Sequence, residues 1–202
     1  MGSIRLFAGI TPPQPVRDHL DFALEDVRAR AGEQLRWTPR ANWHITLSFY
    51  GEQPASSTGE ISDYLRSVAE STSPMSIHLA GAGSFHSTRL WIGVGGETDR
   101  LRGLMSECLL DADLPRRNRA HLSVATLSGS RRPQRSRGRR PSPVVANSTP
   151  RLDNFVHALS VYAGPEFDVD AIELFESRLG EGPGGAPAYD VLARFPFRTA
   201  ST

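Results

Sequence analysis

The sequence predicts a mixed α+β or α/β fold whose central strands come from two similar halves of the chain. Short apolar runs alternate with stretches of helical periodicity, which is typical of a sheet covered by helices. The run RLFAGI at residues 5–10 is echoed by RLWIGV at residues 89–94. After each copy, a helical stretch leads to a strand-like run that carries histidine two residues before threonine or serine. We interpret this repeat as a degenerate internal duplication.

The first half begins with an apolar run at residues 4–10, which is typical of a short buried strand. An amphipathic helical pattern follows over residues 16–27, and Gly32 lies just beyond it, where helices commonly stop. After the strand-like run at residues 42–51, apolar residues at helical spacing predict a second helix over residues 61–68.

The run NWHITLSFYG at residues 42–51 alternates between apolar and polar side chains. Successive side chains of a regular strand point to opposite faces. The face toward the core is expected to carry Ile45, Leu47 and Phe49. The opposite face is expected to carry His44, Thr46, Ser48 and Tyr50. An imidazole and a hydroxyl therefore share one face, which is either a polar surface or half of an active site.

The second half repeats this order of elements. Strands are expected at residues 76–80 and 89–94, and an apolar helical pattern between Leu101 and Cys108 predicts the helix that follows. The closing strand, RAHLSVA at residues 119–125, carries His121 and Ser123. Its histidine and hydroxyl have the same spacing as the pair in the first half.

The C-terminal part is expected to contain one helix and a β-hairpin. Thr149 and Pro150 resemble the start of a helix that runs toward Gly164. Strands at residues 171–179 and 188–195 flank the loop GEGPGGAP, which is typical of a hairpin connection.

Composition limits the classes of function. The chain has 202 residues, a formal net charge of +1 and no apolar run of the roughly 18 residues that a membrane span needs, so we expect a cytoplasmic globular protein. Cys108 is the only cysteine, which excludes an internal disulfide. All 23 basic residues are arginine. A lysine Schiff base, a lysyl-nucleotide intermediate and a P-loop lysine are thereby excluded.

Two histidines on paired strands suit phosphoryl transfer. One neutral imidazole can accept a proton from water while the other, protonated, donates to the leaving oxygen. The hydroxyls of Thr46 and Ser123 can hydrogen-bond phosphate oxygens as charge builds, although both residue types are also ordinary strand formers. A zinc site is the competing interpretation, but the sequence offers no HExxH motif, cysteine pair or third ligand at a recognisable spacing.

These motifs resemble the two-histidine (2H) phosphoesterase superfamily, and within it the RNA 2′,3′-cyclic phosphodiesterases, also described as 2′-5′ RNA ligase-like proteins. The family pattern is two copies of His-x-Thr/Ser-x with apolar x, and the copies here are HITL at residues 44–47 and HLSV at residues 121–124. The segments RLFAGI, RWTPRANWHITLSFYGE, IELFESRL and YDVLARFPF also resemble family features in the family's order. The resemblance covers nearly the whole chain.

The resemblance implies one bilobal α+β domain over residues 1–202, with two pseudo-symmetric lobes around a central cleft. It implies metal-independent, cofactor-free hydrolysis of 2′,3′-cyclic phosphate ends to 2′-phosphates, with weak 2′-5′ ligation as a side reaction. His44 and His121 would be the acid/base pair, while Thr46 and Ser123 would hold the phosphate. Our preferred assignment makes His121 activate water and His44 protonate the 3′ oxygen, although the reverse fits the sequence equally well. The expected partners of this monomer are RNA ends or small cyclic nucleotides.

Two positions depart from the family pattern. Many relatives have proline before the second histidine and arginine three residues after its hydroxyl partner, where this chain has Ala120 and Thr126. A non-catalytic module that binds nucleotides or RNA ends is therefore the alternative function. Arg131 or Arg132 is a candidate substitute for the absent arginine.

Several residues have both a structural and a functional interpretation. The segment 128–148 has six arginines between residues 131 and 140 and no apolar periodicity, so we expect a flexible loop, with contact to RNA as its functional alternative. His19, His78, His86 and His157 lack a repeated partner, and a structural or surface role is expected. Packing, rather than stacking on a nucleobase, is expected for Trp37, Trp43, Phe49 and Tyr50.

Overall fold

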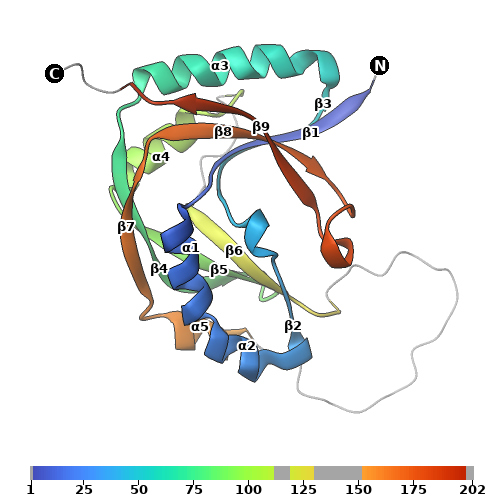
Figure 1. Cartoon of the computed structure of the whole chain (residues 1–202), viewed down its shortest axis with the longest axis vertical. Helices are drawn as coiled ribbons and strands as arrows, with labels where there is room; N and C mark the ends of the chain where they lie inside the picture. The colour runs from blue at the N-terminus through green and yellow to red at the C-terminus, as the bar shows by residue number, and fades with distance from the viewer. Residues whose placement is uncertain (1, 112–118, 130–151, 199–202) are drawn as a thin grey trace, which may run out of the picture.

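A computed structural model of the chain describes residues 2–111, 119–129 and 152–198. In these ranges one antiparallel sheet of nine strands curls around the interior, and helices pack on its outside (Figure 1). The strands are β1 (Ser3–Ile10), β2 (Leu35–Trp37), β3 (Ile45–Pro54), β4 (Met75–Phe85), β5 (Arg89–Gly96), β6 (His121–Leu127), β7 (Ala163–Val169), β8 (Ala171–Arg178) and β9 (Ala188–Pro196). The mixed α+β fold expected from the sequence is confirmed.

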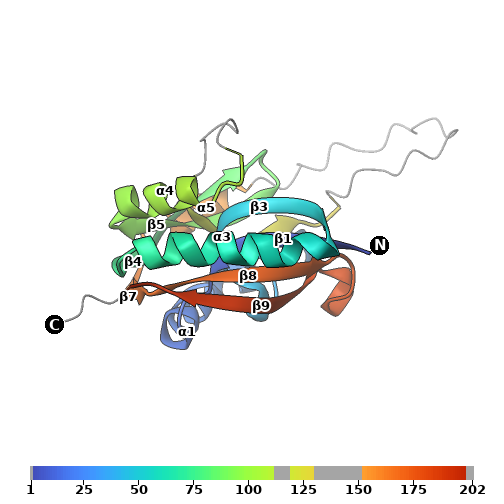
Figure 2. The same cartoon turned by 90° about the horizontal axis from the view of Figure 1, so that it is seen from above.

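Five α-helices accompany the sheet within the described ranges. They are α1 (Gln14–Ala23), α2 (Glu25–Ala31), α3 (Thr58–Ser71), α4 (Thr98–Glu107) and α5 (Asp153–Leu159). Helix α3 lies along β8 and β9, whereas α4 and α5 pack on β3, β4 and β5 (Figure 2). None of these helices is long and apolar enough to cross a membrane.

The strand order shows the internal repeat. It runs β7-β4-β5-β6-β3-β1-β8-β9, with β2 added beside β6. Read outward from the β3–β6 junction, each side has a histidine-bearing strand first and an RLF/RLW strand second, namely β3 and β1 on one side and β6 and β5 on the other. The duplicated segments therefore occupy equivalent places about the centre of the sheet.

The apolar face of the central strands forms the core. Leu6, Ile45, Leu90 and Leu122 are fully buried there. Burial of one such side chain stabilises a fold by roughly 1.5–3 kcal/mol. Because neighbouring side chains alternate between faces, this buried row fixes which residues point to the concave side of the sheet.

The predicted alternation of β3 is correct at its start and wrong beyond Leu47. Two bulges against β1 shift the register, so Gly9 lies opposite Thr46, Ala8 opposite Ser48 and Phe7 opposite Phe49. A bulge adds one residue to a strand and thereby reverses the faces that follow it. Ser48 is consequently buried, at 3% exposure, and Phe49 is 52% exposed.

Other elements differ from the sequence prediction. The helix expected over residues 16–27 is divided at Leu24 into α1 and α2. The short strand β2 and the edge strand β7 were not predicted; β7 contains Pro165, which an edge strand tolerates because it lacks a second neighbour to hydrogen-bond. The arginine-rich segment 131–140 and the proposed helix start at Thr149 lie outside the described residues.

Candidate active site

A pocket of about 410 Å³ opens at the centre of the sheet, where the two halves of the chain meet. The motif residues that line it are His44, Thr46, His121 and Ser123. Other parts of its wall come from β1, β2, β5 and the β8–β9 hairpin, represented by Arg5, Phe7, Arg36, Arg89, Pro187 and Tyr189. The structure thus brings together all four site residues expected from the sequence.

The register between β3 and β6 explains this convergence. Ile45 pairs with Leu122, and both side chains are fully buried on the core face. Their neighbours along each strand must then point to the concave face. Antiparallel pairing places His44 across from Ser123 and Thr46 across from His121, and directly opposite residues have Cβ atoms about 5 Å apart.

Each histidine ring is held by the main chain in the same way. His44 Nδ1 lies 2.8 Å from the Asn42 carbonyl oxygen, and His121 Nδ1 lies 2.8 Å from the Arg119 carbonyl oxygen. A carbonyl oxygen only accepts, so Nδ1 carries the proton and donates it in both neutral rings. This bond fixes the tautomer and makes Nε2 the acceptor nitrogen of each ring.

The two hydroxyl groups differ in their present contacts. Thr46 Oγ1 lies 3.0 Å from His44 Nε2 and donates to it when the ring is neutral. No hydrogen bond of the Ser123 hydroxyl occurs within the described parts of the chain. A ligand oxygen can therefore use Ser123 at once, whereas it must compete with His44 for Thr46.

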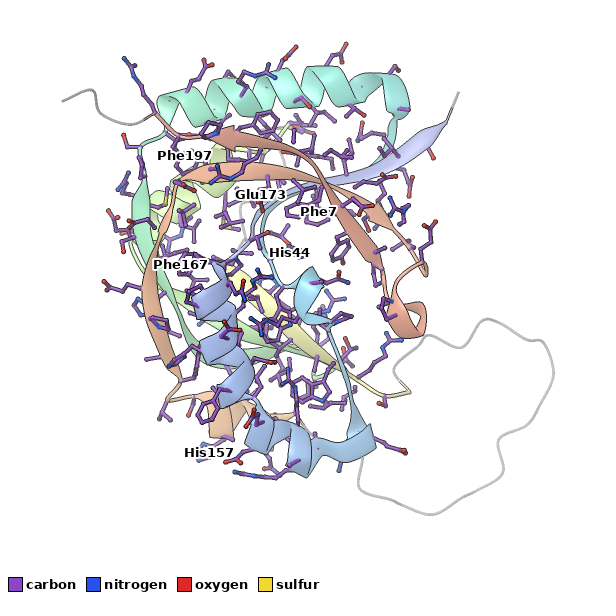
Figure 3. The ribbon with its side chains drawn as sticks, viewed as in Figure 1. Phe7, His44, His157, Phe167, Glu173 and Phe197 are labelled. Atoms are coloured by element: carbon purple, nitrogen blue, oxygen red, sulfur yellow. The ribbon has the colours of Figure 1, made fainter. Side chains whose placement is uncertain are left out.

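Aromatic rings surround both histidines. The ring centroids of Phe7 and His44 lie 4.7 Å apart (Figure 3). Those of Tyr189 and His44 lie 5.2 Å apart, in a T-shaped arrangement. His121 has Phe85 as its neighbour at 4.8 Å and Trp91 at 6.0 Å. Each imidazole therefore lies among aromatic side chains and lines the pocket.

This enclosure lowers the basicity of both histidines. Burial is the main cause that lowers the pKa of His44 to about 4, and the neighbouring His121 adds to the shift. Burial also lowers the pKa of His121, with Arg89 and Arg119 as further causes. The carbonyl contact of each Nδ1 opposes the shift. At neutral pH, the unliganded pocket therefore holds His44 as a neutral proton acceptor.

Asn42 connects the His44 strand to the other wall of the pocket. Its carbonyl accepts from His44, while its side-chain Nδ2 donates to the Pro187 carbonyl at 2.7 Å. Asn42 is 9% exposed, so this bond is shielded from water. The β8–β9 loop and the first histidine are thus tied to one residue.

The chain is similar to proteins of known family and activity. Residues 10–94 match the model of the family described as LigT like Phosphoesterase. An RNA 2′,3′-cyclic phosphodiesterase of Methanothermobacter thermautotrophicus is 27% identical over 136 residues, which is 63% of this chain and 73% of that protein. One of Geobacillus stearothermophilus is 28% identical over 170 residues, or 79% of this chain and 47% of that protein. This part of the chain is therefore similar to the LigT-like phosphoesterases.

Solved structures agree with this family at the level of the fold. E. coli LigT complexed with NADP+ superposes with a TM-score of 0.69 at 18% identity, covering 98% of this chain and 100% of that chain. A Thermus thermophilus protein superposes with a TM-score of 0.64 at 23% identity, covering 96% and 98% of the two chains. The fold of the curled sheet is therefore shared over nearly the full length of this chain.

The aromatic residues divide between core and pocket. Trp43 is buried at 1% exposure, as expected of a packing residue. Tyr50 is half-buried and donates to the Cys108 carbonyl at 3.0 Å. Trp37 and Phe49 instead line the pocket. The expectation that Phe49 packs in the core is wrong, because the β3 bulges turn it outward.

Other residues of this pocket were missed by sequence reasoning. Asn42, Phe7, Tyr189, Arg36 and Arg89 all line the pocket. Phe7 and Arg89 belong to the repeated RLF and RLW segments, so the repeat itself was a usable signal for them. Tyr189 and Arg36 belong to β9 and β2, and only the folded sheet brings them to the histidines.

The remaining histidines lie apart from this pocket. None of His19, His78, His86 and His157 is among its lining residues. Within the described ranges, no group of three or more His, Cys, Asp or Glu residues is placed to hold a metal ion. The substitutes considered for the absent arginine, Arg131 and Arg132, lie outside the described residues.

Proposed function

We propose that this protein hydrolyses RNA 2′,3′-cyclic phosphate ends to 2′-phosphates. The observation that carries the proposal is the matched placement of His44 and His121 at one pocket, each with Nδ1 bound to a main-chain carbonyl. The named activity of the Methanothermobacter and Geobacillus relatives supports it. E. coli LigT, which shares the fold, has been crystallised with phosphate and with 3′-AMP.

The proposed reaction is one in-line displacement at phosphorus. A water oxygen attacks the phosphorus of the cyclic phosphate while the bond from phosphorus to the 3′ oxygen breaks. One imidazole takes the proton of the attacking water on Nε2, and the other gives its Nε2 proton to the departing 3′ oxygen. The scheme needs two histidines in opposite protonation states and no metal ion.

We assign His44 as the base and His121 as the acid. A pKa of about 4 keeps His44 neutral at working pH and therefore able to accept a proton. The pKa of His121 is also lowered, by burial and by Arg89 and Arg119, and an anion bound beside this ring would oppose that shift and favour its protonated form. This assignment reverses the one that we preferred from the sequence, which itself left both open.

Thr46 and Ser123 are assigned to the non-bridging phosphate oxygens. Both hydroxyls line the pocket on the same face as the imidazoles. Hydrogen-bond donors aimed at an anion stabilise charge that grows in the transition state. When phosphate engages Thr46, the hydroxyl leaves His44 Nε2, and the base becomes free to accept from water.

The same displacement accounts for weak 2′-5′ ligation. If the 5′-hydroxyl of a second RNA takes the place of water, the attack joins it to the phosphorus while the 3′ oxygen leaves. The product is then a 2′-5′ phosphodiester. Absence of lysine from the chain is consistent with this route, which forms no lysyl-nucleotide intermediate.

The test is hydrolysis of a cyclic-phosphate nucleotide in the presence of a chelator. We expect formation of a 2′-phosphate at an unchanged rate, and a loss of roughly 10²–10⁴-fold in kcat for either His44→Ala or His121→Ala. His157→Ala is the matched control, because this exposed histidine lies outside the pocket. Turnover that survives both pocket substitutions would refute the assignment. Nucleotide binding without turnover would instead identify the non-catalytic binding module.

A further inference from the structure

Two arginines flank Thr126 on the neighbouring strands of the sheet. Thr126 pairs with Arg36 of β2 on one side and with Arg89 of β5 on the other. All three residues line the pocket. A row of two guanidinium groups with a hydroxyl between them therefore crosses three strands at one end of the site.

A bulge in β6 brings Thr126 onto the pocket face. Trp91 of β5 pairs with Ser123 and Leu90 pairs with Ala125, so Val124 is the additional residue. Val124 and Ala125 are both fully buried. In a regular strand, Thr126 would point away from Ser123, because the two positions are an odd number apart. Because of the bulge, Thr126 points to the same face as Ser123 and adds one polar side chain to the pocket face of β6.

The two guanidinium groups of this row are unneutralised. Neither Arg36 nor Arg89 forms an ion pair within the described part of the chain, and both side chains are exposed. Arg5 is the equivalent of Arg89 in the other half of the chain, but its charge has an acidic partner. It lies 3.6 Å from Glu52 and stacks over Phe49 at 4.6 Å. Positive charge is therefore concentrated at the His121 end of the pocket.

The charge of Arg89 reaches the reaction site. It contributes to lowering the pKa of His121, and it opposes the burial that raises the pKa of Tyr189. Its guanidinium is therefore close to both walls of the pocket. The space near it is open, since Arg36, Arg89 and Thr126 all contribute to the lining of the same cavity.

We propose that Arg36 and Arg89, together with the Thr126 hydroxyl, form a second anion site that binds the phosphodiester on the 5′ side of the terminal nucleotide. This inference rests on the proposed function and names its substrate class: oligonucleotides that end in a cyclic phosphate, rather than free cyclic mononucleotides. Guanidinium groups offer paired donors that match phosphate oxygens. The second anion site would bind the negative charge of the 5′-side phosphodiester, a group that a cyclic mononucleotide does not have.

Distance along the strand separates this site from the reacting phosphate. Thr126 is three residues beyond Ser123, and a strand advances about 3.3 Å per residue, slightly less across a bulge. Along the strand, Ser123 and Thr126 are therefore roughly 8–10 Å apart, which is more than the width of one phosphate group. The reacting phosphate already has Thr46, Ser123 and the two imidazoles as partners, so the arginine pair is available to a neighbouring phosphate.

The kinetic test compares two substrates in one double variant. For Arg36→Gln/Arg89→Gln, we expect the ratio of kcat/KM on a trinucleotide with a 2′,3′-cyclic phosphate to kcat/KM on the cyclic mononucleotide to fall by about 10- to 100-fold. Arg102→Gln is the matched control, since Arg102 lies on α4 outside the pocket. Equal loss on both substrates would overturn the inference, because the arginines would then act on the reacting phosphate. An unchanged trinucleotide rate would overturn it as well.

A binding test decides the inference independently of turnover. Fluorescence anisotropy would follow a labelled trinucleotide that ends in a 2′-phosphate over a range of salt concentrations. The slope of log K against log salt should decrease in magnitude by about 0.7 in the double variant, since the site neutralises one phosphate and each neutralised phosphate of a single strand contributes about 0.7. An unchanged slope would refute the second anion site. If wild-type protein hydrolyses neither substrate, the proposed function fails, and this slope still decides whether the anion site exists.

Discussion

At the scale of single residues, the site depends on two imidazoles with one hydrogen-bonding pattern and different environments. His44 has Phe7 and Tyr189 as ring neighbours, whereas His121 has two arginines that act on its charge. Similar groups in different surroundings acquire different proton affinities. In the proposed mechanism, that difference would let the repeated motif supply an acid and a base at the same pH.

The assignment of acid and base predicts the response to a better leaving group. When sulfur replaces the 3′ oxygen of the substrate, the thiolate leaves phosphorus without being protonated. Hydrolysis of this substrate therefore does not need the acid. We expect this substrate to restore most of the rate of His121→Ala and little of the rate of His44→Ala, as measured by single-turnover kinetics. Restoration of His44→Ala alone would establish the reverse assignment.

The residues that the sequence identified are those with a repeated neighbour. His44 and Thr46 were recognisable because His121 and Ser123 repeat their spacing. Asn42, Arg36 and Tyr189 gave no such signal, since their roles arise from contacts with loops and strands distant in the chain, such as the bond from Asn42 to Pro187. Single-sequence patterns contain spacing but not these tertiary contacts.

At the scale of elements, the bulges determine which side chains reach the pocket. In β3, the side chains that follow Leu47 point to the opposite face from the one that regular alternation predicts. In β6, the same reversal follows Ser123. Each histidine strand therefore presents a third side chain five positions after its histidine, Phe49 in one half and Thr126 in the other. Alternation predicted the start of both strands correctly. The bulges were not predictable, because they depend on register with β1 and β5.

Close packing between β1 and His44 predicts the effect of a single methyl group. A Cβ at Gly9 would lie 3.1 Å from the Ile45 carbonyl oxygen, 3.3 Å from the Phe175 ring and 3.6 Å from the His44 ring. We expect Gly9→Ala to lower the free energy of unfolding by about 1–3 kcal/mol, as overpacking does, and to reduce kcat. Urea denaturation and steady-state kinetics would measure the two effects.

Gly103 supplies the control for this substitution. It lies within α4, and no atom approaches the position of its Cβ within 4 Å. Gly103→Ala should raise the free energy of unfolding by about 0.5–1 kcal/mol and leave kcat unchanged, because alanine favours helix. Equal behaviour of the two variants would contradict the role of Gly9 in positioning the site.

At the scale of the whole molecule, the histidine environment makes stability depend on pH. The pKa of His44 is about 4 in the folded protein and about 6.5 in an unfolded chain. Between these values the unfolded state binds more protons, so stability is present above pH 6.5 and is lost as pH falls toward 4. At pH 5, this single group should cost about 2 kcal/mol relative to pH 7.

Urea unfolding at pH 7 and pH 5 checks this expectation. His44→Gln should lose about 2 kcal/mol less than the wild type between the two pH values. His157→Gln should keep the wild-type difference, because His157 is exposed. The same pH response in all three proteins would show that His44 is not held neutral by the fold.

The equivalent main-chain bonds of the two rings have a consequence for evolution. Every amino acid supplies a carbonyl oxygen, so replacement of the side chain at position 42 or 119 leaves the acceptor of each Nδ1 in place. Substitutions at the residues beside the imidazoles therefore do not remove the hydrogen bonds that orient the two rings. The fold itself is kept at the 18% identity that separates this chain from E. coli LigT.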